Sequence, residues 1–84
     1  MTAKEMFEKL GYECIEDEDH FIEYIITWDD WHGKGVLEIV FDYDIKEIQF
    51  LCYIKDKEKE RVDITLNIEE LQAINKQVEE LGWK

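Results

Sequence analysis

The clearest pattern of apolar and polar positions lies in residues 36–54, VLEIVFDYDIKEIQFLCYI, and predicts a β-hairpin. Apolar side chains occupy every second position of both arms, at Leu37, Ile39 and Phe41 in the first and at Ile48, Phe50, Cys52 and Ile54 in the second. A period of two is typical of strands that bury one face. We expect an acidic turn within residues 42–46, and we expect the rest of the chain to cover this hairpin.

Further strands are predicted on both sides of the hairpin. Residues 21–28 place Ile22, Tyr24, Ile26 and Trp28 on one face, while the other face has only Glu23 and Thr27 as polar members and is expected to be partly covered. Residues 12–15 predict a brief strand, and Val62, Ile64 and Leu66 predict a final one. Residues 16–19, 29–35 and 55–61 are polar or glycine-containing and predict exposed turns or loops.

Both ends of the chain predict helices. Thr2 and Glu5 fit a capping box, the apolar residues Ala3, Met6, Phe7 and Leu10 follow at helical spacing, and Gly11 is placed to end a helix over residues 3–10. Asn67 is placed to cap a second helix that ends at Gly82. Its apolar stripe is expected to comprise Ile68, Leu71, Ile74, Val78 and Leu81.

The order of these elements predicts the fold class. A helix, four or five strands joined by short connections and a second helix predict an α+β fold with an antiparallel sheet. We expect both terminal helices to pack on one face of this sheet as a two-layer sandwich. The 84 residues contain no proline, and no linker or internal repeat is evident, so the sequence predicts a single domain over residues 1–84.

Charge is the unusual feature of the composition. The chain has 22 acidic and 10 basic residues, which gives a formal net charge of −12. The first thirty residues hold ten of the acidic residues against Lys4 and Lys9. This balance argues against direct binding to nucleic acid or to an anionic membrane, because both require a surplus of Lys and Arg. It favours a basic protein partner, or it serves solubility.

The acidic residues near the N-terminus form the candidate partner-binding site. An extended chain rises ~3.3 Å per residue, close to the ~3.4 Å between charges along one DNA strand. A basic groove that normally holds DNA or RNA is therefore expected to accept this segment in its place. The candidate residues are Glu16, Asp17, Glu18, Asp19, Glu23, Asp29, Asp30 and Trp31, the last as an apolar anchor. A purely solvating role for the acidic residues, and a loop-anchoring role for Trp31, remain open alternatives.

The sequence predicts no catalytic residue, no metal ligand and no cofactor. Cys14 and Cys52 lie far apart in apolar contexts and are expected to be buried free thiols. His20 and His32 have no partner at the close spacing that zinc sites use, and the chain contains no serine. No apolar run approaches the ~20 residues that cross a bilayer, and no secretory leader is evident. We therefore expect a cytoplasmic protein that is not an enzyme.

Two terminal segments, MTAKEMFEKLGY and EELQAINKQVEELGW, resemble small uncharacterised proteins encoded by phages and prophages of Gram-positive bacteria. The resemblance covers about a third of the chain and lies in the two helices, with a variable β-rich part between them. It implies a phage gene expressed inside a bacterial host cell, where small acidic proteins are often inhibitors of host machinery. It implies no site residues.

Together, the residues and the resemblance favour a phage-encoded protein-binding domain. Our first hypothesis is an acidic nucleic-acid mimic that occupies the basic surface of a host defence protein, or of another host protein that handles nucleic acid. The alternative is a structural or assembly module that self-associates or docks on another phage protein through an exposed sheet face. A third hypothesis, a small-ligand binder, requires an aromatic-lined cavity. The identity of the partner, the oligomeric state and the strand order are open at this level.

Overall fold

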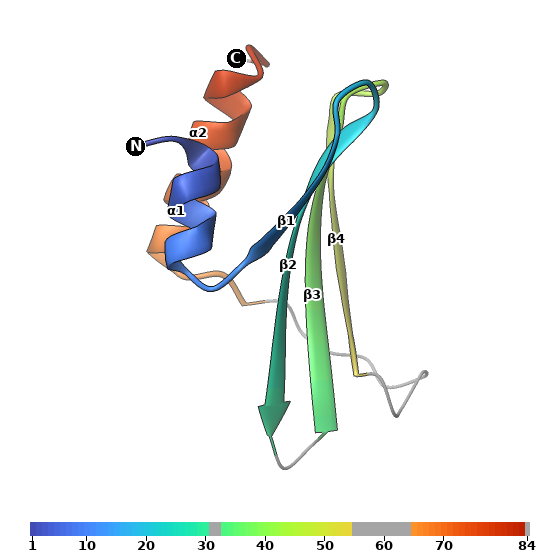
Figure 1. The fold of residues 1–84 in the computed structure, drawn as a ribbon, viewed down its shortest axis with the longest axis vertical. Coiled ribbons are helices and arrows are strands. Elements are labelled where there is room, and N and C mark those ends of the chain that lie inside the picture. The colour runs from blue at the N-terminus through green and yellow to red at the C-terminus, as the bar shows by residue number, and fades with distance from the viewer. Residues whose placement is uncertain (31–32, 55–64, 84) are drawn as a thin grey trace.

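A computed structural model describes residues 1–30, 33–54 and 65–83 of the chain. Its elements follow the chain in the order α1 (Ala3–Lys9), β1 (Glu13–Asp17), β2 (Phe21–Asp30), β3 (Gly33–Asp42), β4 (Glu47–Ile54) and α2 (Ile68–Glu80) (Figure 1). The α+β class predicted from the sequence is confirmed. No helix in the described residues is long and apolar enough to cross a membrane.

The four strands form one antiparallel sheet in the order β1-β2-β3-β4, so every strand pairs with its neighbour along the chain. The predicted hairpin is confirmed: β3 and β4 pair from Gly35 opposite Ile54 to Asp42 opposite Glu47, and the chain reverses between them. Leu37 lies opposite Ile26 on one side and opposite Cys52 on the other. The apolar faces of neighbouring strands are therefore in register.

The strands are longer than the sequence predicts. Glu16 and Asp17, expected in a turn, pair with Ile22 and Phe21 and belong to β1. The loop expected over residues 29–35 is mostly strand as well, because the β2–β3 ladder continues to Asp30 opposite Gly33. Polar side chains on a strand that is open to solvent on one face cost little, so the ladder continues into polar sequence. The predicted strand over residues 62–66 falls largely outside the described residues; Thr65 and Leu66 are described and are not in a strand.

The predicted helix ends are confirmed atom by atom. In α1 the amide of Glu5 donates to Thr2 Oγ1 at 3.2 Å and the amide of Thr2 donates back to Glu5 Oε1 at 3.0 Å. In α2, Asn67 and Glu70 make the same reciprocal pair. At the other ends, Gly11 and Gly82 adopt positive φ angles of 96° and 72°, which side chains disfavour.

Each of these glycines is followed by an aromatic residue that packs in the core or against it. The amide of Tyr12 donates to the carbonyl of Phe7, and the amide of Trp83 donates to the carbonyl of Val78, both at 3.1 Å. These six-to-one hydrogen bonds define Schellman motifs. Tyr12 is buried and Trp83 packs against the core cluster.

The core lies between the helices and the sheet face that carries Ile22, Tyr24, Leu37, Ile39 and Phe41. At its centre, the ring of Phe7 from α1 stacks on the ring of Tyr24 from β2, with centroids 3.9 Å apart and an interplanar angle of 16°. Phe7 also meets Tyr12 and Phe41 edge-on. Both helices lie on the same side of the sheet (Figure 1), and the opposite face carries neither of them.

The two helices run antiparallel and are joined at both ends. The amide of Ala3 donates to Glu80 Oε2 at 2.9 Å, and the hydroxyl of Tyr12 donates to the carboxylate of Glu70. Inside the core, the hydroxyl of Tyr24 donates to Gln77 Oε1 at 2.5 Å. Glu70 and Glu80 of α2 therefore bind the segment that contains α1. The buried side-chain amide of Gln77, also in α2, binds β2.

The predicted apolar stripe of α2 is confirmed in part, since Ile74 is buried and Val78 and Leu81 pack against the core cluster. Ala73, Ile74 and Gln77 are buried, whereas Ile68 and Leu71 are 65% and 45% exposed. The helix is rotated so that the small side chain of Ala73 lies in the core cluster. Gln77 is tolerated in the core because Tyr24 supplies a hydrogen bond to its carbonyl oxygen.

We expect Tyr24→Phe to lower the free energy of unfolding by about 1–3 kcal/mol, because it leaves the buried oxygen of Gln77 without its donor. The double variant Tyr24→Phe/Gln77→Leu is expected to recover most of this loss, since it removes both polar partners. Urea unfolding of the three proteins checks this. A double variant no more stable than Tyr24→Phe would contradict the assigned role of the hydrogen bond.

Candidate functional site

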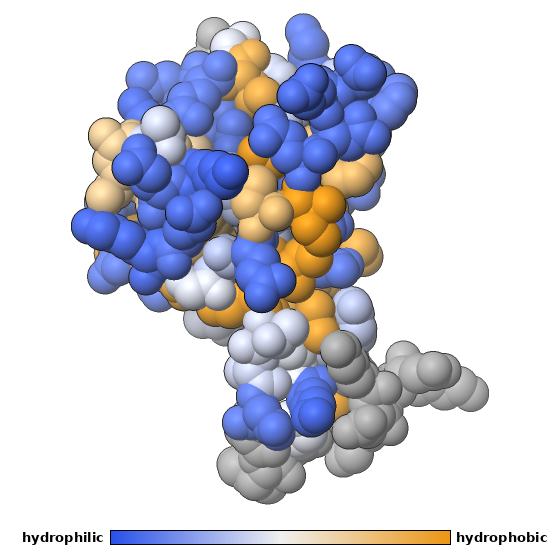
Figure 2. Space-filling model, in the orientation of Figure 1, coloured by the Kyte–Doolittle hydropathy of each residue, from blue (hydrophilic) through white to orange (hydrophobic). Residues whose placement is uncertain are grey.

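The strand order brings two acidic turns together at one end of the sheet. The β1–β2 and β3–β4 connections lie side by side (Figure 1), because the amide of Tyr43 donates to the carbonyl of His20 at 2.9 Å. His20 Nδ1 also lies 3.4 Å from Asp44 Oδ2. We call this region the acidic end and define it by its carboxylates: Glu16, Asp17, Glu18, Asp19, Asp42, Asp44 and Glu47. Figure 2 shows it as a group of hydrophilic side chains at the upper right.

Two of these carboxylates build the turns. Asp17 Oδ1 accepts the amide of Asp19 at 3.1 Å, and Asp42 Oδ1 accepts the amide of Asp44 at 2.9 Å. Asp side chains favour turns for this reason, since they hydrogen-bond the backbone two residues on. Glu18 and Asp19 are exposed.

The acidic end is a compact group and not a ladder of evenly spaced charges. Glu16 and Asp17 are neighbours in β1, so their side chains point to opposite faces of the sheet. Residues 18–20 form the turn, where the rise of an extended chain no longer applies. The spacing expected along a DNA strand is therefore not formed by residues 16–19.

The remaining predicted site residues lie elsewhere. Glu23 is on the sheet face opposite the helices. Asp29 is eight residues along β2 from Phe21, or ~26 Å away at the usual rise per residue, and lies opposite Lys34. Asp30 is the last residue of β2, and Trp31 lies outside the described residues. The structure thus brings Glu16, Asp17, Glu18 and Asp19 together and separates Asp29 and Asp30 from them.

Sequence reasoning missed Asp42, Asp44 and Glu47 as members of this group. Their positions follow from the chain order alone, because consecutive antiparallel strands place the first and third turns at the same end of a sheet. The acidic turn predicted within residues 42–46 was the signal from which this grouping could have been predicted.

The sheet face opposite the helices mixes carboxylates with aliphatic side chains. We define the open-face patch as two adjacent rows across the four strands, namely Glu13, Ile25, Glu38 and Leu51, and Ile15, Glu23, Val40 and Gln49. Ile15 and Leu51 are 48% and 50% exposed.

Glu23 lies inside this patch, opposite Ile15 on one side and Val40 on the other. Partial burial raises its pKa, and the nearby carboxylate of Glu38 raises it further. The two residues are diagonal neighbours, since Glu23 lies opposite Val40 and Glu38 lies opposite Ile25. A carboxylate in this position is held among aliphatic side chains and next to a like charge.

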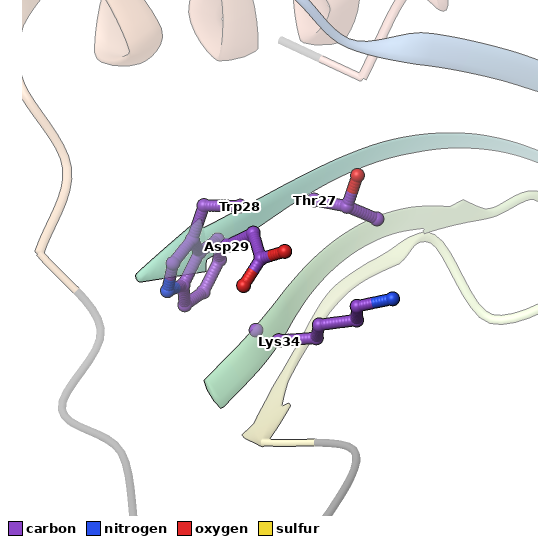
Figure 3. Close-up of a pocket in the computed structure, with 5 residues that line it drawn as sticks. Thr27, Trp28, Asp29 and Lys34 are labelled. Atoms are coloured by element: carbon purple, nitrogen blue, oxygen red, sulfur yellow. The ribbon is translucent and has the colours of Figure 1, made fainter. Parts of the chain in front are cut away.

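A shallow hollow of about 390 Å³ lies at the other end of the sheet, lined by Thr27, Trp28, Asp29, Lys34 and Gly35 (Figure 3). The indole of Trp28 lies over Gly35, where a Cβ atom would come within 2.0 Å of Trp28 Cε2. Trp28 is the aromatic residue among these lining residues, so they do not form the aromatic-lined cavity that the small-ligand hypothesis requires.

The thiols and possible metal ligands are dispersed. Cys14 in β1 and Cys52 in β4 are free and half-buried, and burial raises the pKa of both. Both thiols are therefore poor nucleophiles at neutral pH. Within residues 1–30, 33–54 and 65–83, no three His, Cys, Asp or Glu side chains are grouped to hold a metal ion.

We expect Glu23→Gln to raise the melting temperature at pH 7. A carboxyl whose pKa is higher in the folded than in the unfolded state loses stability as the pH rises above its ordinary value of 4.5. The gain is therefore expected to vanish near pH 3, where both states are protonated. Thermal unfolding across this pH range checks it, with Glu13→Gln on the same face as the control for one lost charge. A gain that is equal at both pH values would contradict this origin.

We expect Gly35→Ala to destabilise the protein by about 1–3 kcal/mol, because the new methyl group overlaps the Trp28 indole. In a Trp28→Val background the same change is expected to cost much less. Urea unfolding of the four proteins in this cycle measures the difference. Equal losses in both backgrounds would show that the indole is not the obstacle.

Comparison with known proteins finds no family model, no curated protein and no solved structure that matches this chain. Its function is therefore inferred from its own surfaces.

Proposed function

We propose that this chain is a two-layer α+β protein-binding domain, encoded by a phage or prophage, that acts in the cytoplasm of a bacterial host and is not an enzyme. In this proposal the acidic end occupies the basic surface of a host protein that handles nucleic acid, such as a defence protein, and inhibits it. The observation that supports it best is the junction of the two acidic turns through Tyr43 and His20. The likeness of the terminal segments to phage and prophage proteins supports the cellular setting.

The chemistry of nucleic-acid grooves supports this choice of partner. Such grooves are lined with Lys and Arg side chains that neutralise phosphates. The acidic end offers seven carboxylates, and Lys46 and His20 are the basic residues within its two turns. A compact acidic group fits a groove that recognises crowded phosphates, and its charge repels nucleic acid itself.

A second candidate is a structural or assembly module that self-associates or docks on another phage protein through the open sheet face. The exposure of Ile15 and Leu51 favours it, with Tyr53 38% exposed on the same face. Ionic strength distinguishes the two candidates. Salt weakens a contact between exposed charges and has much less effect on an apolar one.

We expect immobilised wild-type protein to recover a nucleic-acid-binding protein from host lysate, with elution by moderate salt and by a competing oligonucleotide. The variant Glu18→Lys/Asp19→Lys is expected to lose this protein. We choose these two positions because Asp17 and Asp42 hold the turns, and reversing them would disturb the fold.

The matched control is Glu8→Lys/Glu79→Lys, which reverses two exposed charges on the helices. Each reversal adds two positive units, so both variants move the formal net charge from −12 to −8. Retention by the control and loss by the turn variant support the proposal. Equal retention by both variants would refute it, and a salt-resistant partner common to all three proteins favours the assembly module.

A further inference from the structure

The open-face patch has a regular composition that the acidic end does not share. Along one row, Glu13, Ile25, Glu38 and Leu51 alternate in character, and in the next row Ile15, Glu23, Val40 and Gln49 alternate in the opposite phase. Side chains directly opposite one another on neighbouring strands lie in contact. Each central carboxylate therefore has an aliphatic neighbour on both flanking strands.

This arrangement disfavours charge on Glu23. Glu23 and Glu38 are both partly buried, and the patch contains no basic residue to pair with them. Burial and the neighbouring Glu38 disfavour the charged form of Glu23. A nearby positive charge favours the charged form of a carboxyl and would oppose both effects. Removing water from the aliphatic members is favourable, so their burial would stabilise a complex.

We propose that the open-face patch docks an amphipathic helix of a partner protein that carries arginine or lysine beside leucine-like residues. Long basic side chains suit this surface, because their methylene stems cover the aliphatic residues while their charged ends reach the carboxylates. Arginine adds bidentate hydrogen bonds to a carboxylate. This is the surface that the second candidate function uses, and the inference names the chemistry of the partner that it would bind. It does not depend on the proposal for the acidic end.

Size and layer packing favour a helix as the occupant. Four strands spaced ~4.8 Å apart span about 14 Å, and a helix with its side chains is about 10–12 Å wide. The patch runs across the face of all four strands, so it offers side chains and not the free backbone groups of a sheet edge. A helix on this face would complete a third layer, as helices do on both faces of many sheets.

Charge disfavours two other occupants. A second copy of this chain would bring Glu13, Glu23 and Glu38 against the same three carboxylates, and like charges in contact oppose association. A wholly apolar partner would leave the central carboxylates buried without a counter-charge, which is costly. Complementary charge on the partner removes both problems.

The test uses a designed 18-residue amphipathic helix with leucine and arginine on one face as the probe. We expect saturable binding by calorimetry, and amide shifts in a 15N-labelled sample at Glu23, Ile25, Glu38 and Leu51 that spare α1 and α2. A peptide with glutamate in place of each arginine is expected not to bind. Shifts confined to the acidic end or to the helices would overturn the proposal, as would an absence of saturable binding.

Matched variants separate a specific surface from general attraction. Glu23→Gln/Glu38→Gln is expected to weaken the peptide about tenfold, which corresponds to the loss of contacts between close charge pairs. Glu69→Gln/Glu79→Gln on α2 removes the same number of charges and is expected to leave the affinity unchanged. Equal weakening by both pairs would mean non-specific attraction and would overturn the proposal.

Two further variants complete the design. Leu51→Gln is expected to weaken the peptide, whereas Leu71→Gln, at a similarly exposed position on α2, is expected not to. Glu18→Lys/Asp19→Lys is expected to bind the peptide like the wild type, because it alters the acidic end alone. Loss of peptide binding in that variant would place the peptide at the acidic end and overturn the inference, while the pull-down tests the proposed function separately.

Discussion

The stack of Phe7 on Tyr24 is the contact on which the rest of the structure depends. It joins α1 to the second strand of the sheet, and the hydroxyl of Tyr24 continues through the core to Gln77 of α2. One strand residue thus holds both helices, which are also tied to each other by Glu80 and Glu70. In a chain of 84 residues, which has a small core, this arrangement fixes the positions of three elements with few side chains.

The sequence was most informative where structure is determined locally. Helix ends require a few residues at fixed spacing, so Thr2 with Glu5 and Gly82 could be read directly. The alternation in residues 36–54 predicted the hairpin for the same reason. Strand ends were harder, because Asp29 and Gly35 are placed by pairing with another strand and not by their own preferences. The rotation of α2 depends on a tertiary hydrogen bond to Gln77, which no local pattern encodes.

The candidate site shows the same division. Neighbours in sequence such as Glu18 and Asp19 could be grouped at once, yet Asp44 joins them only through the strand order. Asp29 and Asp30, close to the first group in sequence, are carried to the other end of the sheet by β2. The length of β2 thus separates these charges, whereas the adjacent turns bring the others together. Acidic residues of this chain therefore lie in at least three places: the two turns, the open sheet face, and the end of the β2–β3 pairing beside Lys34.

The alternation along β2 has a consequence for how such a protein changes over time. Tyr24 faces the helices, while Glu23 and Ile25 on either side of it face away. Adjacent positions are therefore constrained separately, one by core packing and the next by the outer surface. Substitutions at the outward positions leave the aromatic stack and the helix caps intact. A lineage can thus replace the side chains of its outer face repeatedly while keeping one core, and such a history would leave an outer face that diverges faster than the inner face.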